Sequence, residues 1–156
     1  MMDAKLKQES PPDPARKKAM GLLARATLDE LNAAWEALAD KPDVHPVRGP
    51  ETGLVMVRGR IGGGGDPFNL GEATVSRATI RLSSGEIGHG QLLGTDRQRA
   101  RLAAIFDALA QREDDRANVD ALLHQVADRL ALEERRNAEE TAATRVDFFT
   151  MVRGDD

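Results

Sequence analysis

The sequence predicts an α+β fold, a single domain in which helices pack on an antiparallel sheet of three to four strands. Apolar residues recur at helical spacing before residue 40 and again after residue 95, and they alternate with a period of two in between. The order is therefore helix, helix, three strands, helix, helix and a final strand, which differs from the strict alternation of a doubly wound sheet. With 156 residues, 40% of them hydrophobic, the chain can bury one core without a metal or a disulfide.

Two helices are predicted at the start of the domain, which we place at residues 14–156 after a disordered, polar, proline-containing leader at residues 1–13. Pro14 suits the first turn of a helix. A capping box from Thr27 to Glu30 opens the second helix, and Lys41-Pro42 closes it. The apolar stripes are Ala15, Ala19, Leu22, Leu23 and Ala26 in the first helix, and Leu28, Leu31, Trp35 and Leu38 in the second, with Trp35 as the packing anchor.

Three strands are predicted in the middle of the chain, after a linker at residues 40–50. The first strand spans residues 53–61, where Val55, Val57 and Ile61 share one face. The glycine run at 62–65 and Asp66-Pro67 form a turn into a strand at 69–82, and Ser83-Ser-Gly85 closes a hairpin into a strand at 87–93. These strands form an antiparallel meander.

Two further helices and a terminal strand complete the prediction. Thr95 to Gln98 forms a second capping box, and Asn118 is expected to cap a longer helix. From about Thr144 the pattern returns to that of a strand. This strand would be apolar on both faces, so one face needs cover from another polypeptide. The predicted partner interface is Arg145, Phe148, Phe149, Met151, Val152 and Arg153.

Composition excludes several classes of function. The formal net charge of -4 and the total of five aromatic residues disfavour a nucleic-acid-binding protein. The chain has no cysteine, no apolar run long enough for a membrane span and no signal-peptide pattern, so we expect a cytoplasmic protein that does not enter a membrane. Its histidines, His45, His89 and His124, lack a second ligand at metal spacing, so we expect neither a metal site nor a cofactor of its own.

Catalytic patterns are also missing. The glycine run is not followed by Gly-Lys-Ser/Thr or by a helix, so a hairpin loop is favoured over a phosphate loop. Flanking glycines would let a ligand approach His89, although an ordinary strand histidine explains it as well. The paired acids Glu133-Glu134 and Glu139-Glu140 are typical of a solvated helix face.

Four arginines of the sheet form a candidate anion site. Arg58 and Arg60 lie two apart on one predicted strand, and Arg77 and Arg81 share a face of the next. If these faces coincide, their guanidinium groups would attract a triphosphate, a phosphonate or an acidic partner. The alternative is that each arginine pairs with an acid at a wet surface, the candidates being Glu51, Glu72 and Glu86.

Several blocks of residues stand in a characteristic order. They are Glu51-Thr-Gly-Leu-Val55, Arg60-Ile-Gly-Gly63, Phe68 with Gly71-Glu-Ala-Thr74 and Ser76-Arg77, Leu92-Leu-Gly-x-Asp96, Asp107-Ala-Leu109 and the closing stretch from Arg145 to Gly154. In this order and spacing the blocks resemble the PhnG family, the G subunit of the bacterial carbon-phosphorus lyase machinery for phosphonate use. The likeness covers residues 18–156, while the leader and residues 64–67 depart from it.

The resemblance implies an accessory subunit of a core complex built from subunits G, H, I and J. In that family picture subunit I, aided by G, H and an ATPase-like L subunit, exchanges the purine base of ATP for an alkylphosphonate. The product is an α-D-ribose 1-phosphonate 5-triphosphate, and subunit J, a radical S-adenosylmethionine enzyme, later breaks the carbon-phosphorus bond. Two hypotheses follow: a scaffold without catalytic residues, whose partners are H, I and J and most directly I, or a subunit whose sheet arginines bind the triphosphate or phosphonate in a shared site.

Overall fold

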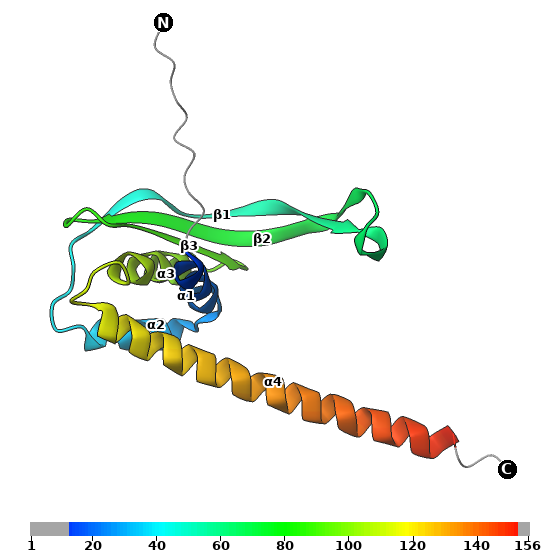
Figure 1. Ribbon diagram of the computed structural model, residues 1–156. Helices are drawn as coiled ribbons and strands as arrows, with labels where there is room; N and C mark the ends of the chain where they lie inside the picture. Colours follow the sequence, from blue (N-terminus) through cyan, green and yellow to red (C-terminus); the bar gives the residue numbers. More distant parts are fainter. Residues whose placement is uncertain (1–12, 153–156) are drawn as a thin grey trace, which may run out of the picture.

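The computed structural model describes residues 13–152, and side chains as far as Thr144. It confirms the α+β class: four helices pack on one three-stranded antiparallel sheet of order β1-β2-β3 (Figure 1). The predicted leader, apart from Asp13, lies outside the described residues. The elements are α1 (Pro14–Arg25), α2 (Leu28–Ala37), β1 (Val44–Arg60), the 3-10 turn η1 (Ile61–Gly63), β2 (Pro67–Leu82), β3 (Ile87–Leu93), α3 (Arg97–Leu109) and α4 (Arg116–Val152).

The helix starts agree with the sequence to within a few residues. The capping box of α2 is confirmed, because the Thr27 hydroxyl accepts from the amide of Glu30 and the Glu30 carboxylate accepts from the amide of Thr27. At α3 the capping residue is Asp96 and not Thr95, since the Asp96 carboxylate accepts from the amide of Arg99. Helix α4 begins at Arg116, so Asn118 lies inside its first turn and is not the cap.

The predicted linker at residues 40–50 is largely wrong, because β1 already begins at Val44. Residues 44–52 pair with the second half of β2, from Val44 opposite Leu82 to Thr52 opposite Ser76. The two prolines of this stretch are tolerated because β1 is an edge strand, whose outward amides need no partner. Register shifts accompany both prolines, one between Pro46 and Arg48 and one between Arg48 and Glu51.

Helix α3 is the centre of the core. It lies between the sheet on one side and α2 and α4 on the other, with α1 beside it in contact with both α3 and β3, and it is buried along most of its length (Figure 1). Gly88 and Gly90 of β3 make this close approach possible: an added Cβ would lie 1.9 Å from the Ala104 carbonyl oxygen at Gly88 and 2.1 Å from the Ala100 carbonyl oxygen at Gly90. The two glycines therefore admit a helix to the sheet, and not a ligand to His89.

Arginine side chains join the helices to one another. Arg129 of α4 donates from Nε to Oε1 of Glu30 at 2.7 Å and from Nη2 to Oε2 at 3.1 Å. This contact lowers the pKa of the buried Glu30 carboxyl below its usual range and raises the pKa of the Arg129 guanidinium. Arg99 of α3 donates to the carbonyl oxygens of Ala24 and Ala26, where α1 ends. Bidentate guanidinium groups thus fix the helices to one another.

The predicted C-terminal strand is wrong, because residues 145–152 continue α4. The chain from Arg116 to Val152 contains neither glycine nor proline, and residues 131–144 are rich in alanine, glutamate and arginine, which favour a helix. Adding a residue to an existing helix satisfies its backbone hydrogen bonds locally, whereas a strand needs a neighbouring strand. The local apolar pattern could not outweigh this.

Candidate docking surface

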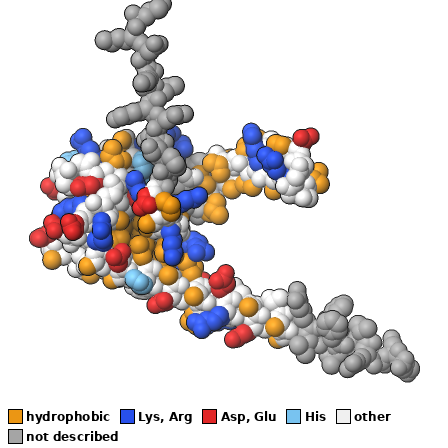
Figure 2. Space-filling view, viewed as in Figure 1, with side chains coloured by type: hydrophobic (Ala, Val, Ile, Leu, Met, Phe, Trp, Pro, Cys, Tyr) orange, Lys and Arg blue, Asp and Glu red, His pale blue; other side chains and the backbone are white. Residues whose placement is uncertain are grey.

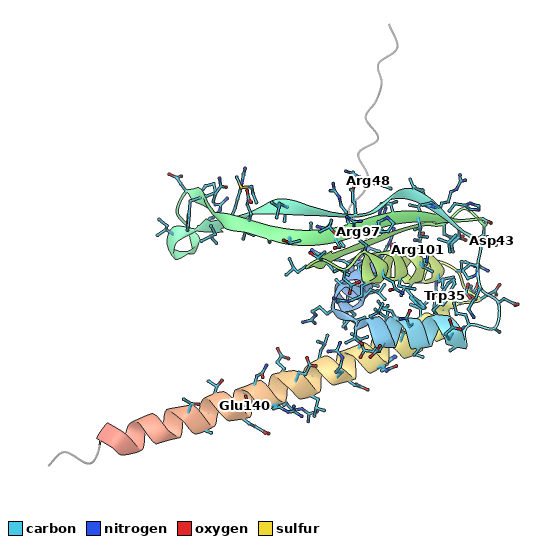
Figure 3. The ribbon with its side chains drawn as sticks, turned by 180° about the vertical axis from the view of Figure 1, so that it is seen from behind. Trp35, Asp43, Arg48, Arg97, Arg101 and Glu140 are labelled. Carbon is cyan, nitrogen blue, oxygen red and sulfur yellow. The ribbon has the colours of Figure 1, made fainter. Side chains whose placement is uncertain are left out.

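Two elements project from the core in the same general direction. One is the far end of the β1–β2 hairpin, residues 53–74, which we call the hairpin arm; the other is the second half of α4 (Figure 1). The arm exists because β3 pairs with β2 only from Val75 to Arg81. Along α4, every described residue from 131 to 144 is exposed, and Glu140 extends from a stretch with no neighbouring element, far from Trp35 on α2 (Figure 3). The space-filling view shows the molecule open between the two projections (Figure 2).

The hairpin arm is apolar on both of its faces. Leu54 and Met56 alternate with Val55 and Val57, and no register shift interrupts the pairing from Glu51 to Val57. Leu54 and Met56 therefore continue the sheet face to which Thr52 and Ser76 belong, the face that α3 covers nearer the core. On the opposite face, Val57 is followed by Gly59, over which the side chains of Phe68 and Leu70 lie.

Most of the large exposed apolar side chains in the described part of the chain belong to this arm. Their exposed fractions are Leu54 65%, Met56 59%, Val57 39%, Ile61 75%, Phe68 41% and Leu70 62%. Single exposed apolar residues are ordinary on a protein surface, but a concentration of them on one projection is typical of an interaction site. A two-stranded hairpin with no third strand is also only marginally stable in water.

The interface predicted from the sequence lies at the end of α4. Arg145, Phe148, Phe149, Met151 and Val152 belong to the last turns of that helix, although their side chains lie outside the described part, and Arg153 lies beyond it altogether. A helix does not place these residues on the alternating faces that the strand prediction assumed. Their contact with a partner stays a prediction, now attached to a projecting helix.

The four sheet arginines do not form one cluster. Arg58 pairs with Asn69 and Arg60 with Pro67 near the tip of the arm, whereas Arg77 pairs with Glu51 and Arg81 with His45 on the three-stranded part. Seven residues of strand separate Glu51 from Arg58, a distance of roughly 23 Å. The two pairs are too far apart to hold one phosphate group together.

Of Arg77 and Arg81, the two arginines on the three-stranded part of the sheet, Arg77 pairs with an acid at the surface, as the alternative interpretation of the sequence predicted. Its Nε lies 2.7 Å from Oε1 of Glu51, and Nε of Arg48 lies 3.0 Å from the same oxygen. The hydrogen bond from Arg77, followed by the charge of Arg48, lowers the pKa of the Glu51 carboxyl. Within residues 13–144, neither Arg58 nor Arg60 takes part in an ion pair, and both are exposed.

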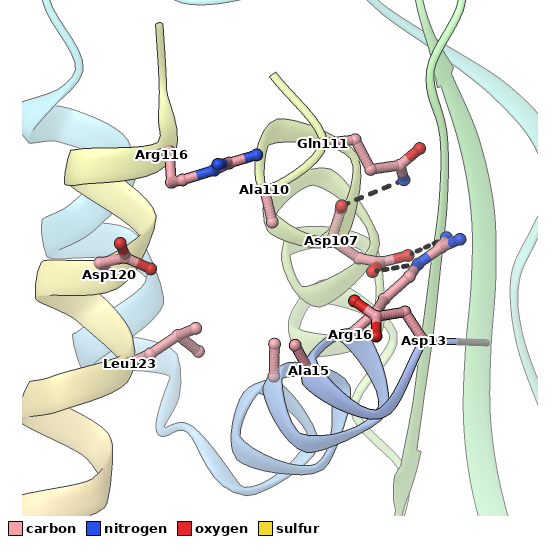
Figure 4. Close-up of a pocket in the computed structure, with 10 residues that line it drawn as sticks. Asp13, Ala15, Arg16, Asp107, Ala110, Gln111, Arg116, Asp120 and Leu123 are labelled. Atoms are coloured by element: carbon pink, nitrogen blue, oxygen red, sulfur yellow. Dashed lines mark hydrogen bonds and ion pairs between the residues drawn. The ribbon is translucent and has the colours of Figure 1, made fainter. Parts of the chain in front are cut away.

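A hollow of about 510 Å³ between α1, α3 and α4 contains several charged groups (Figure 4). Its wall contains Arg16, whose Nε and Nη2 already donate to the buried carboxylate of Asp107 at 3.1 and 2.8 Å. That carboxylate also accepts from the amide of His89. Because Asp13, Asp107 and Asp120 outnumber Arg16 and Arg116 on its wall, the hollow is poorly suited to a phosphate, and we interpret the Arg16–Asp107 pair as a structural contact.

The histidines do not converge on a site. His45 contacts the Ser83 hydroxyl, His89 contacts the Thr79 hydroxyl, and His124 contacts the Asp120 carbonyl oxygen of its own helix. No group of three acidic or histidine side chains arranged to hold a metal occurs in the described part of the chain. Among the helices of that part, none combines the length and apolar character needed to cross a membrane.

Sequence reasoning missed the hairpin arm, although two signals were present. The run Leu54-Val-Met-Val57 is apolar on both faces, which is the argument that the sequence analysis applied only to the C-terminal stretch. In addition, the two strands predicted on either side of the glycine turn match poorly in length with a third strand of seven residues. A long hairpin beside a short third strand has to overhang it.

The fold and this surface define a class of protein: a small α+β protein whose buried acids Glu30 and Asp107 are paired with arginines of its own fold, and which exposes apolar residues on a projection. Comparison with known proteins identifies the family within that class. The family model described as "Phosphonate metabolism protein PhnG" matches residues 14–154, and the chain belongs to this family. A curated relative from Rhizobium meliloti (strain 1021) is "Alpha-D-ribose 1-methylphosphonate 5-triphosphate synthase subunit PhnG"; it is 72% identical over 156 residues, covering all of both chains.

Proposed function

We propose that this chain is an accessory, non-catalytic subunit of an α-D-ribose 1-methylphosphonate 5-triphosphate synthase. It would support the exchange of the purine base of ATP for an alkylphosphonate, with subunits H, I and J of the carbon-phosphorus lyase core as its partners and subunit I as the most direct one. The full-length identity of 72% to a protein named as a subunit of this synthase carries the proposal. An identity this high over the whole chain favours the same assembly.

The distribution of polar groups supports the accessory role. Catalysis of base exchange requires groups that can activate a nucleophile or stabilise the charge that develops on the leaving base. In the described part of the chain, the buried acids Glu30 and Asp107 are instead neutralised by Arg129 and Arg16 within the fold. The exposed surface of the two projections is better suited to contact with other polypeptides than to chemistry.

Co-expression tests the proposal. Subunits H, I and J are produced with and without this chain, and release of adenine from ATP in the presence of methylphosphonate and subunit L is followed by chromatography. We expect assembly and adenine release to require this chain, and the purified chain alone to release none. Adenine release by the chain alone would contradict the non-catalytic assignment, and a fully assembled, active complex without the chain would contradict its requirement.

The C-terminal part of α4 is tested in the same system. We expect Phe149→Glu, or deletion from Arg145 onward, to prevent co-purification with the complex. Leu132→Glu is the matched control, because Leu132 is an exposed apolar residue of the same helix. If Phe149→Glu and the deletion from Arg145 onward both assemble normally, this segment is not part of the interface.

The second candidate function is that arginines of this chain bind the triphosphate or the phosphonate in an active site shared with a partner subunit. The arginines that fit this function are now mainly those of the arm. Arg58 and Arg60 are exposed and outside the ion pairs recorded for residues 13–144, so they are able to meet a triphosphate supplied by a partner's site. In that case their replacement by alanine leaves assembly intact and raises the KM for ATP or methylphosphonate.

A further inference from the structure

We propose that the hairpin arm inserts into an apolar cleft of another synthase subunit that encloses both of its faces and presents carboxylates near its tip. This inference rests on the proposed function, because it assumes that the chain assembles with other subunits. It names the surface that does so and the chemistry of the partner surface.

The two apolar faces decide between a cleft and a flat contact. Leu54 and Met56 lie on one face, and Val57, Phe68 and Leu70 on the other. A partner that lies flat against the arm covers one set and leaves the other in water, so only a surface with two walls removes both from solvent.

The exposed area argues against a second copy of this chain as the occupant. With roughly 150–200 Å² for a complete apolar side chain, the exposed fractions along the arm amount to about 600 Å² over both faces. Two arms related by a two-fold axis would bury one face each, which is about half of this apolar area, and would leave the other face in water.

The edge of β1 also differs between the core and the arm. Residues 44–52 carry Pro46, Pro50 and two register shifts, which are features that discourage pairing with another chain. The stretch from Gly53 to Val57 has no proline, no charge and no register shift. The protective features are therefore missing from residues 53–57, as expected if this stretch is covered in the assembly, and a register shift and a charge return at Arg58.

The charges of the arm indicate what lies at its tip. By strand alternation, Arg58 and Arg60 continue the face of Leu54 and Met56. Burying this face would desolvate two guanidinium groups unless the partner supplies acceptors, and planar guanidinium groups pair best with carboxylates. The cleft is therefore apolar along its walls and acidic where the tip enters.

The test uses the full chain with subunits H, I and J. One variant, Leu54→Glu with Met56→Glu, changes the first face; a second, Val57→Glu with Leu70→Glu, changes the other. Val47→Glu is the matched control, because Val47 lies on the same strand and is 58% exposed, against 59% for Met56. Thermal unfolding of each purified variant establishes that the fold is intact, and the apparent Kd for the remaining subunits is measured by titration.

We expect each face variant to weaken assembly at least tenfold and Val47→Glu to change it less than twofold, with charge reversal at Arg58 and Arg60 weakening it as well. If wild type assembles and both face variants assemble equally well, the cleft is refuted while the proposed function stands. If only one face matters, a flat contact replaces the cleft. If the wild-type chain does not assemble, the proposed function falls and this inference with it. A dimer of the isolated chain that both face variants abolish would make a second copy the occupant and overturn the proposal.

Discussion

The contact of β3 with α3 offers the sharpest test of the fold, through the substitution Gly90→Ala. The new Cβ would lie 2.1 Å from the carbonyl oxygen of Ala100 and 2.7 Å from the amide nitrogen of Ala104, both of them backbone atoms of a buried helix. Real Cβ atoms essentially never come closer than 3.0 Å to such atoms, so strand and helix must separate by about 1 Å. No side-chain rotation relieves the clash, because the obstructing atoms belong to the backbone.

We expect Gly90→Ala to lower the free energy of unfolding by at least about 2 kcal/mol, at the upper part of the range for overpacked cores. In a chain of this size that corresponds to a fall in Tm of about 4–8 °C, measured by circular dichroism on the purified chain. Gly21→Ala is the control: it lies in α1 with no atom within 4 Å of its added Cβ, and we expect a gain of about 0.4–1 kcal/mol. A Tm for Gly90→Ala within 1 °C of wild type would refute the close packing of α3 on β3.

Three further predictions concern charged groups. Asp107→Asn replaces one of the two carboxylate oxygens that accept from Arg16 with an amide NH2 group, which donates. We expect the free energy of unfolding, measured in urea, to fall by about 2 kcal/mol. The loss is smaller than for a fully buried pair because Arg16 is one-third exposed. Glu30→Gln should lower the free energy of unfolding more at pH 7 than at pH 3: Arg129 depresses the folded pKa of Glu30, so the contribution of its charge is complete above the usual value of about 4.3 and is lost as the pH falls toward and through the folded pKa. If Glu30→Gln lowers the free energy of unfolding by the same amount at pH 7 and at pH 3, the ionised Glu30–Arg129 pair is excluded as the cause of that loss. Finally, Arg77→Ala should leave the KM of the assembled synthase unchanged, since Arg77 is paired with Glu51; a raised KM would return it to the substrate site.

The sequence by itself determined the fold class and most of the element boundaries. Period-two alternation from residue 69 to 82 placed β2, and Ala78, Ile80 and Leu82 are indeed buried on one face. The capping box at Thr27 and the helical stripe after Asp96 likewise depend on neighbours three or four residues away. Such features are local in sequence and can therefore be recognised without knowledge of the tertiary structure.

Tertiary structure decided where those elements end and which residues meet. Residues 44–52 become a strand only because β2 offers them a partner, and residues 145–152 become helix because α4, already anchored to α2 by Arg129, propagates through them. The pairing register separates Arg58 and Arg60 from Arg77 and Arg81, which no spacing along the chain reveals. The short third strand leaves the arm uncovered, because burial depends on which element lies opposite a residue in space, and this is a property of the whole fold and not of any segment.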